Sequence, residues 1–340
     1  MTAVPGEEVA ALPLVDRFGR VHRSLRISVT DRCNIRCFYC MPDVNVAFRP
    51  REELLTFEEI AAVAAALAPA GIAKIRLTGG EPLVRRGLDR LVARLAALPG
   101  VADVALTTNG LLLAEQAAAL KAAGLTRLNV SLDALTEATF RRIARRDGLA
   151  RVLEGLAEAK RVGFAGIRLN AVALAGLTEA EAVPLAEFAR REGFTLRFIE
   201  FMPLDAEQTW RRGGVLTGET LRAILAAAVG PLVPVERPDP AQPATDYAWA
   251  DGGGRVGFID PVSRPFCGAC DRLRLTAEGA LRNCLFSGDE WDLRAILRSG
   301  GDAADVRAAV RDALAAKQPG HGIDDPSFLR PARAMYQIGG

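Results

Sequence analysis

The chain has 340 residues, half of them apolar, and a formal net charge of +2 at pH 7. This length is enough for one large α/β domain with a smaller one beside it, or for two ordinary domains. The near-neutral charge gives no overall attraction to nucleic acid or to a membrane surface, and no apolar stretch reaches the roughly 20 residues of a membrane-spanning helix. The N-terminal residues do not form a secretory signal. We therefore expect a cytoplasmic protein that binds neither nucleic acid nor membrane.

Short β-branched runs alternate with amphipathic helical patterns in the first two thirds of the chain. The runs predict parallel strands at 25–29, 74–78, 103–108, 127–132, 166–174 and 195–201. The helical patterns cover 57–68, 88–98, 113–124, 149–163 and 181–193, and several end at a glycine. Alternating strands and helices favour a parallel sheet, and six units are fewer than the eight of a complete barrel. We predict an α/β fold with a partial (β/α)6 TIM-type barrel; a doubly wound open sheet is the alternative.

The pattern changes near residue 230. Five prolines lie between residues 231 and 243, and we expect no regular element there. A hairpin-like segment with cysteines follows, and then a short helix near 305–317. We interpret residues 1–230 as the barrel and residues 231–340 as a smaller C-terminal domain.

All six cysteines fall into two groups. The first is Cys33, Cys37 and Cys40, spaced C-x3-C-x2-C after the first predicted strand, and the second is Cys267, Cys270 and Cys284, spaced C-x2-C-x13-C. In a reducing compartment such groups are typical of metal or redox ligands rather than of disulfides. Three thiolates are one ligand short of a closed zinc site and of a fully ligated cubane iron–sulfur cluster. A zinc site or incidental thiols remain alternatives, although the chain offers only His22 and His321 as further nitrogen ligands.

The first group and its position resemble the radical S-adenosylmethionine (SAM) superfamily. In that superfamily three cysteines hold a [4Fe–4S] cluster, and the amino and carboxylate groups of SAM chelate the open iron. The second predicted strand ends in TGGEP, residues 78–82, which is similar to the superfamily's GGE segment. Glycine lets the backbone approach a ligand closely, and Glu81 offers an acceptor for a cationic amine.

Further segments are similar to one family within this superfamily, the GTP 3′,8-cyclases of molybdenum cofactor biosynthesis. They include LTTNGLLL, NVSLDAL, RFIEFMP and GFIDPVSRPFCGACDRLRLT, and the likeness extends over residues 18–340. The resemblance implies a lyase that converts GTP to 3′,8-cyclo-7,8-dihydro-GTP. A 5′-deoxyadenosyl radical made from SAM removes the 3′ hydrogen of the ribose, and the carbon radical attacks C8 of the purine. It also implies a homodimer, an external electron donor and a product passed to the cyclic pyranopterin monophosphate synthase.

The same resemblance implies roles for individual residues. The first cysteine group holds the SAM cluster, and the second holds another [4Fe–4S] cluster whose open iron meets the guanine. The implied SAM pocket contains Tyr39, Gly80, Glu81, Ser131 and Met202. The implied GTP contacts are Arg26, Lys74, Arg76, Thr107, Arg168, Arg272, Leu273 and Arg274. Catalytic roles are implied for Arg272, Arg274, Gly339 and Gly340, the last two because the family's Gly-Gly tail threads into the active site.

The chemistry of these residues supports a triphosphate site, because arginine forks bind phosphates well where water is excluded. Taken singly, each residue also has an ordinary explanation. A strand arginine is commonly solvent-facing or ion-paired, and Met202 fits core packing. Thr107 fits a strand interior, and Ser131 and Asp133 fit the N-cap of a following helix. A chain end is commonly frayed.

Two positions depart from the family pattern, since Arg168 stands where lysine is usual and Asp271 where asparagine is common. Two other functions stay open. A radical SAM enzyme with an auxiliary cluster that modifies a peptide or a tetrapyrrole would share the first motif, but it gives no reason for the Gly-Gly tail. A zinc or iron–sulfur interaction protein would use the cysteines without catalysis.

Overall fold

The computed structural model describes residues 12–326 and 328–339. Within them, one curved sheet of twelve strands has the order β12-β11-β10-β1-β2-β3-β4-β5-β6-β9-β8-β7. Its middle consists of β1 (Ser24–Ser28), β2 (Lys74–Thr78), β3 (Asp103–Thr108), β4 (Arg127–Ser131), β5 (Arg168–Ala173) and β6 (Thr195–Glu200). These six strands are parallel and lie in chain order. The predicted partial barrel is confirmed, because a doubly wound sheet would reverse its strand order.

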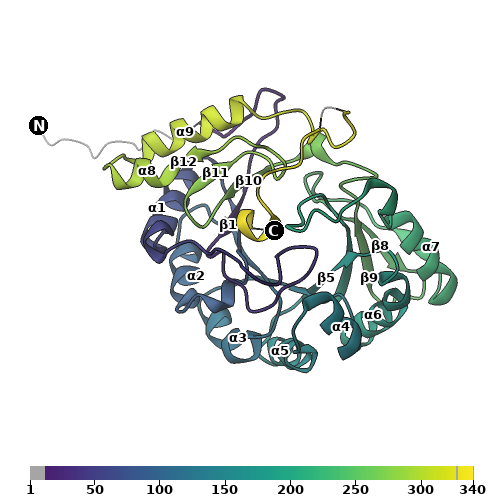
Figure 1. Ribbon diagram of the computed structural model, residues 1–340. Coiled ribbons are helices and arrows are strands. Elements are labelled where there is room, and N and C mark those ends of the chain that lie inside the picture. The colour runs from purple at the N-terminus through teal and green to yellow at the C-terminus, as the bar shows by residue number, and fades with distance from the viewer. Residues whose placement is uncertain (1–11, 327, 340) are drawn as a thin grey trace, which may run out of the picture.

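Helices cover the outer face of the curved sheet (Figure 1). They are α1 (Phe57–Leu67), α2 (Leu88–Ala96), α3 (Leu113–Ala122), α4 (Glu137–Ala144), α5 (Leu149–Arg161), α6 (Thr178–Glu192) and α7 (Gly218–Ala228). Each turns an apolar stripe toward the strands; α2, for example, buries Leu88, Leu91, Val92 and Leu95. The prediction missed α4 and α7. The apolar pattern of α4 extends over eight residues only, which gives a weak periodic signal.

The chain after residue 230 extends both edges of the same sheet. At one edge, β9 (Arg255–Ile259) runs parallel to β6, and β8 (Thr245–Trp249) and β7 (Leu232–Pro234) follow antiparallel. At the other edge, β10 (Arg272–Leu275) runs parallel to β1. The antiparallel strands β11 (Ala280–Arg282) and β12 (Trp291–Asp292) complete that edge. The domain boundary at residue 230 stays a prediction.

The proline-rich stretch contains a strand that we did not expect. Pro234 lies in β7 and has no N–H with which to pair. However, β7 is the outermost strand and pairs only with β8, and an edge strand tolerates proline because one side of it needs no partner. The expectation of no regular element between residues 231 and 243 is therefore wrong for Leu232–Pro234.

Three further helices follow the sheet. Helices α8 (Leu293–Arg298) and α9 (Ala303–Ala315) lie beside α1, on the outside of the molecule (Figure 1). The short helix α10 (Met335–Ile338), yellow in Figure 1, lies inside the ring of strands. No described helix is long and apolar enough to cross a membrane.

One apolar core lies between the strands and the helices, and it includes residues from both ends of the chain. Leu25 of β1, Leu273 of β10 and Phe258 of β9 all belong to it. The ring of Phe198 in β6 stacks on that of Phe258, with centroids 6.1 Å apart and an angle of 16° between the rings. The C-terminal strands therefore share the core of the six central strands.

This shared core predicts that the whole sheet unfolds as one unit. Phe198→Ala should lower the free energy of unfolding by about 3–5 kcal/mol, because it removes a fully buried ring. All three tryptophans, Trp210, Trp249 and Trp291, lie after β6. Urea unfolding followed by tryptophan fluorescence and by far-UV circular dichroism should therefore give coincident midpoints that shift together. Separate midpoints would contradict the shared core, and Phe18→Ala, at a half-exposed ring, is the control.

Candidate active site

The two cysteine groups lie at opposite ends of neighbouring strands. Cys33 comes after the carboxyl end of β1, whereas Cys270 comes just before the amino end of β10, and these two strands are parallel. Because β11 runs antiparallel to β10, Cys284, which follows β11, returns to the same end as Cys270. A strand of five residues spans about 16 Å, so the inner face of the sheet lies between the two groups.

All six cysteines line one cavity of about 590 Å³ inside the ring of strands. They are half-buried free thiols. The structure brings most predicted SAM and GTP residues to the same cavity. These are Tyr39, Gly80, Glu81, Ser131, Met202, Arg26, Lys74, Arg76, Thr107, Arg168, Arg272 and Arg274. Leu273 is different: its side chain is fully buried in the core and does not line the cavity, so only its main chain is left for a nucleotide contact.

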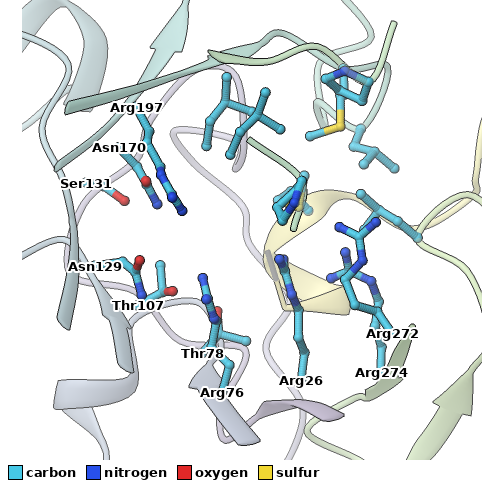
Figure 2. A pocket seen from close by; sticks show the side chains of 18 of the residues that line it. Arg26, Arg76, Thr78, Thr107, Asn129, Ser131, Asn170, Arg197, Arg272 and Arg274 are labelled. Carbon is cyan, nitrogen blue, oxygen red and sulfur yellow. The ribbon is translucent and has the colours of Figure 1, made fainter. Parts of the chain in front are cut away.

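Strand alternation turns a row of arginines toward the cavity. Arg274, Arg26 and Arg76 lie side by side at one level of β10, β1 and β2, and Figure 2 shows their side chains pointing inward. Leu25 and Ile27, the alternate residues of β1, are buried in the core. Three neighbouring strands therefore place three guanidinium groups on one wall.

Several of these guanidinium groups have no counter-ion. Within the described part of the chain, Arg26, Arg76 and Arg168 form no ion pair or hydrogen bond with a carboxylate. Burial, and then the charge of Arg272, lower the pKa of Arg26 to about 10. Burial, and then the charge of Arg26, lower the pKa of Arg76 well below its usual range. Holding like charges together without counter-ions costs free energy, so this wall suits a multiply charged anion.

Sequence reasoning missed two arginines and two amides on the same inner face. Arg127 and Arg197 line the cavity, as do Asn129 and Asn170, and Figure 2 shows Asn129, Asn170 and Arg197 along one side of it. Arg127 and Arg197 are paired with carboxylates, those of Asp103 and Asp246, whereas the neighbouring Arg168 is not. A two-residue alternation applied to every predicted strand would have found all four.

The first cysteine loop is held against the end of β2 by main-chain contacts. The Gly80 N–H donates to the Thr30 carbonyl at 2.7 Å, and the Glu81 N–H donates to the Arg32 carbonyl at 2.8 Å. A Cβ at Gly79 would lie 2.5 Å from the Thr30 oxygen, and one at Gly80 would overlap the Arg32 carbonyl. The two glycines thus permit a close approach of the loop that carries Cys33.

The Glu81 carboxylate is committed to the protein itself. It accepts hydrogen bonds from the Leu83 N–H at 3.0 Å, the Thr108 hydroxyl at 2.7 Å and the Asn109 N–H at 2.7 Å. Burial raises the pKa of Glu81 to about 7. Glu81 therefore ties the ends of β2 and β3 together, while its contact with the SAM amine stays a prediction.

The structure decides between the alternatives for Ser131 and Asp133. Helix α4 is capped by Thr136, so neither residue is its N-cap. Instead, Ser131 lines the cavity, and Asp133 accepts a hydrogen bond from the Tyr39 hydroxyl at 2.7 Å and another from the Val172 N–H at 2.8 Å. Asp133 thereby fixes Tyr39, which lies between two cysteines of the first group.

Met202 and Thr107 also face the cavity rather than serving only as core residues. Both are half-buried, and Met202 packs against the small apolar cluster of Trp210, Val262 and Ile323. Core packing therefore explains the contacts of Met202 with this apolar cluster but not its exposure to the cavity.

Neither histidine is placed as a zinc ligand for the cysteine groups. The His321 ring hydrogen-bonds the Pro261 carbonyl at 2.7 Å through Nε2 and accepts from the Ile323 N–H at 3.1 Å through Nδ1. His22 is fully buried outside the cavity. Within the described residues, no three Cys, His, Asp or Glu side chains surround a single point that could hold one metal ion.

The donor set nevertheless fits a cluster held by three thiolates. A cubane takes each thiolate on a different iron atom, and each cysteine group borders the cavity into which an open iron would project. In the second group, burial acts to raise the pKa of Cys270, but the charges of Arg272 and Lys317 outweigh it, and the pKa falls to about 7. Arg272 also donates to the Cys270 Sγ at 3.4 Å. A thiolate is thus stabilised at this position.

The C-terminal tail reaches the same region. The Met335 N–H donates to the Leu204 carbonyl at 2.9 Å, and Tyr336 and Ile338 are buried. The Gly339 carbonyl accepts from Arg274 at 2.8 Å, and a Cβ at Gly339 would lie 2.8 Å from that of Ser28. The described tail is therefore anchored rather than frayed; Gly340 lies outside the described residues.

Comparison with known proteins agrees with this geometry. Residues 27–189 match the family described as the Radical SAM superfamily, and residues 194–323 match the one described as Molybdenum Cofactor Synthesis C. In fold, the chain is similar to the crystal structure of Streptococcus suis SuiB bound to S-adenosylmethionine. The TM-score is 0.59 and the identity 12%, over 88% of this chain and 68% of that one. The fold is thus that of radical SAM enzymes.

Curated relatives define the family more narrowly. The chain is 51% identical to the GTP 3′,8-cyclase of Rhodopirellula baltica, over 97% of this chain and 92% of that protein. It is 45% identical to the GTP 3′,8-cyclase of Pelotomaculum thermopropionicum, over 96% of this chain and 99% of that protein. The chain belongs to the GTP 3′,8-cyclase family of the radical SAM superfamily.

The close contact at Gly80 leads to a prediction for the first cysteine group. Gly80→Ala should push the Arg32 main chain away from β2, lower the free energy of unfolding by about 1–3 kcal/mol and reduce the iron bound to the first group. Urea unfolding and iron analysis after anaerobic reconstitution measure both effects. Gly213→Ala, where an added Cβ meets nothing within 4 Å, should change neither; wild-type iron content in Gly80→Ala would contradict the prediction.

Proposed function

We propose that this protein is a GTP 3′,8-cyclase, the lyase that converts GTP to 3′,8-cyclo-7,8-dihydro-GTP in the first step of molybdenum cofactor biosynthesis. The observation that carries the proposal is the inward row of arginines between two three-cysteine groups, in which Arg26 and Arg76 have no ion pair with a carboxylate of the described residues. A triphosphate supplies the missing negative charge. Its nucleoside can then lie between the two ends of the cavity.

The cofactors are two [4Fe–4S] clusters and SAM. Cys33, Cys37 and Cys40 would hold the first cluster, which would supply the electron for the reductive cleavage of SAM. The protein binds, orients and excludes water. Tyr39, held by Asp133, borders the SAM side of the cavity together with Ser131 and Met202.

On the GTP side, Arg26, Arg76 and Arg168 bind the triphosphate. Arg274 continues this row on β10, and Arg272, which donates to the Cys270 Sγ, lies beside the second cysteine group, where the guanine binds. The C3′–H bond of the ribose breaks, the C3′–C8 bond forms, and an electron with a proton completes the product. Arg168 keeps the positive charge that lysine supplies in the family. Asp271 accepts a hydrogen bond from the Ser24 hydroxyl at 2.6 Å, and it replaces none of the three cysteine ligands.

We further propose that the enzyme acts as a homodimer in the cytoplasm, takes electrons from an external donor and passes its product to the cyclic pyranopterin monophosphate synthase. A peptide or tetrapyrrole substrate is the weaker alternative, because neither requires the uncompensated arginine row.

One assay separates these functions. Anaerobically reconstituted protein with SAM, GTP and dithionite should release 5′-deoxyadenosine, methionine and the cyclised nucleotide in equal amounts. Cys267→Ala should still bind SAM but form no cyclised nucleotide, because the guanine loses its cluster. SAM cleavage that is stimulated by a peptide and not by GTP would overturn the proposal, and normal turnover by Cys267→Ala would overturn the role of the second cluster.

Replacing an arginine of this row should weaken GTP binding but stabilise the fold in the absence of nucleotide. Arg76→Met should weaken GTP binding about 10- to 100-fold, because it removes charge-assisted hydrogen bonds to phosphate. The same change should raise the free energy of unfolding without nucleotide by about 1 kcal/mol, because it relieves like-charge repulsion. Equilibrium dialysis and urea unfolding measure the two effects, and Arg151→Met, on an exposed pair with Glu115, is the control. A destabilised variant with unchanged GTP affinity would assign Arg76 to structure alone.

A further inference from the structure

The second cysteine group comes from two chain segments, and two buried cations lie behind it. One segment is the turn from Cys267 to Cys270, and the other carries Cys284. The cations are Lys317, just after α9, and Arg20, in the N-terminal turn, which are 3% and 9% exposed. Neither lines the cavity, so neither has been assigned to SAM or GTP.

Lys317 joins these two segments. Its ammonium group donates to the Asn283 carbonyl and, at 3.3 Å, to the Arg272 carbonyl. Asn283 immediately precedes Cys284, and Arg272 follows Cys270 by two residues. One ammonium group therefore fixes the main chain beside two of the three cysteines, on the side away from the cavity.

Arg20 holds the beginning of the Cys267–Cys270 turn. Its guanidinium group donates to the Cys267 carbonyl at 2.9 Å, and to the Pro319 and Gln318 carbonyls at 3.0 and 2.8 Å. Its charge is neutralised by Asp16, whose carboxylate lies 2.6 Å from Arg20 Nε. Lys317 thus holds the main chain beside Cys270 and Cys284, whereas Arg20 holds the main chain at Cys267. Arg20 also connects Cys267 to Gln318 and Pro319, the residues that follow Lys317.

Lys317 differs from Arg20 in its charge balance. Within the described residues it has no carboxylate partner, and its hydrogen bonds end on neutral carbonyls. A buried ammonium group without an acid costs free energy unless negative charge lies nearby. Burial is the largest influence on the pKa of Lys317 and lowers it; the charges of Arg20 and Arg272 lower it further, whereas those of Cys270 and Cys284 act to raise it. Cys270 and Cys284 are therefore the groups whose negative charge favours a charged Lys317.

We propose that Lys317 is a positioning residue of the second cysteine group: it fixes the Cys270 and Cys284 segments and places an uncompensated positive charge behind the cluster that they hold. The inference rests on the proposed second cluster. Reduction adds an electron to an already anionic cluster–thiolate unit, and a nearby cation favours the more negative state. Lys317 thereby raises the midpoint potential of the second cluster and slows its loss.

The test isolates the second site by using the full chain with Cys33, Cys37 and Cys40 replaced by alanine. This parent protein is compared with the same chain carrying Lys317→Met, Lys317→Gln or Lys317→Arg. Met removes charge and donors, Gln keeps a donor without the charge, and Arg keeps the charge. Lys160→Met, at an exposed pair with Glu192, is the control. Iron and sulfide per chain are measured after anaerobic reconstitution, and the midpoint potential by redox titration with electron paramagnetic resonance.

We expect Lys317→Met to lose most of the iron, Lys317→Gln to keep a cluster of lower midpoint potential, and Lys317→Arg and Lys160→Met to resemble the parent. Iron content and potential equal to the parent in Lys317→Met would overturn the inference. If circular dichroism shows that Lys317→Met does not fold, equal potentials in Lys317→Gln and Lys317→Arg would overturn it. A parent without iron would instead overturn the proposed second cluster, so the two failures are distinguishable.

Discussion

The sheet holds three arginine side chains close together on one wall of the cavity, in spite of the repulsion between their positive charges. Arg274, Arg26 and Arg76 lie at one level of three adjacent strands and face the same cavity. Parallel pairing fixes the strands about 4.8 Å apart, so these cations cannot separate without breaking the sheet. The apolar core behind them, to which Leu25 and Leu273 contribute, holds the arrangement together. A bound polyanion relieves this repulsion, and the free energy that is recovered contributes to binding.

Both cysteine loops are supported by hydrogen bonds to main-chain carbonyls. At the first group, Gly79 and Gly80 allow the loop of Cys33 to lie directly on the end of β2, and Arg36 donates to the Cys33 carbonyl at 2.7 Å. At the second group, buried side chains donate to the carbonyls of the ligand segments. Both groups therefore have an arginine on a ligand carbonyl, and the second also has Lys317 on the carbonyls of Asn283 and Arg272.

The sequence allowed the six central strands, the barrel and both cysteine groups to be predicted, because a period of two and a fixed spacing are local signals. Arg127 and Arg197 were missed because the period of two was not applied to every predicted strand, although both occupy inward-facing positions. The role of Glu81 was also hidden: its three hydrogen-bond donors come from the ends of two different strands. β7 was missed because a proline is excluded from a strand only when that strand has neighbours on both sides, and edge position is a property of the whole sheet.

Two neighbouring strands of the sheet, β1 and β10, lie far apart along the chain, so the cavity wall that they form is completed late in synthesis. β1 begins at Ser24 and its neighbour β10 at Arg272, so the wall that carries Arg26 and Arg274 is completed only after most of the polypeptide has left the ribosome. Until then the edge of β1 is open, and the second set of thiols does not exist. The second cysteine group is therefore complete only late in translation, and a chain that ends before Cys267 contains the first cysteine group alone.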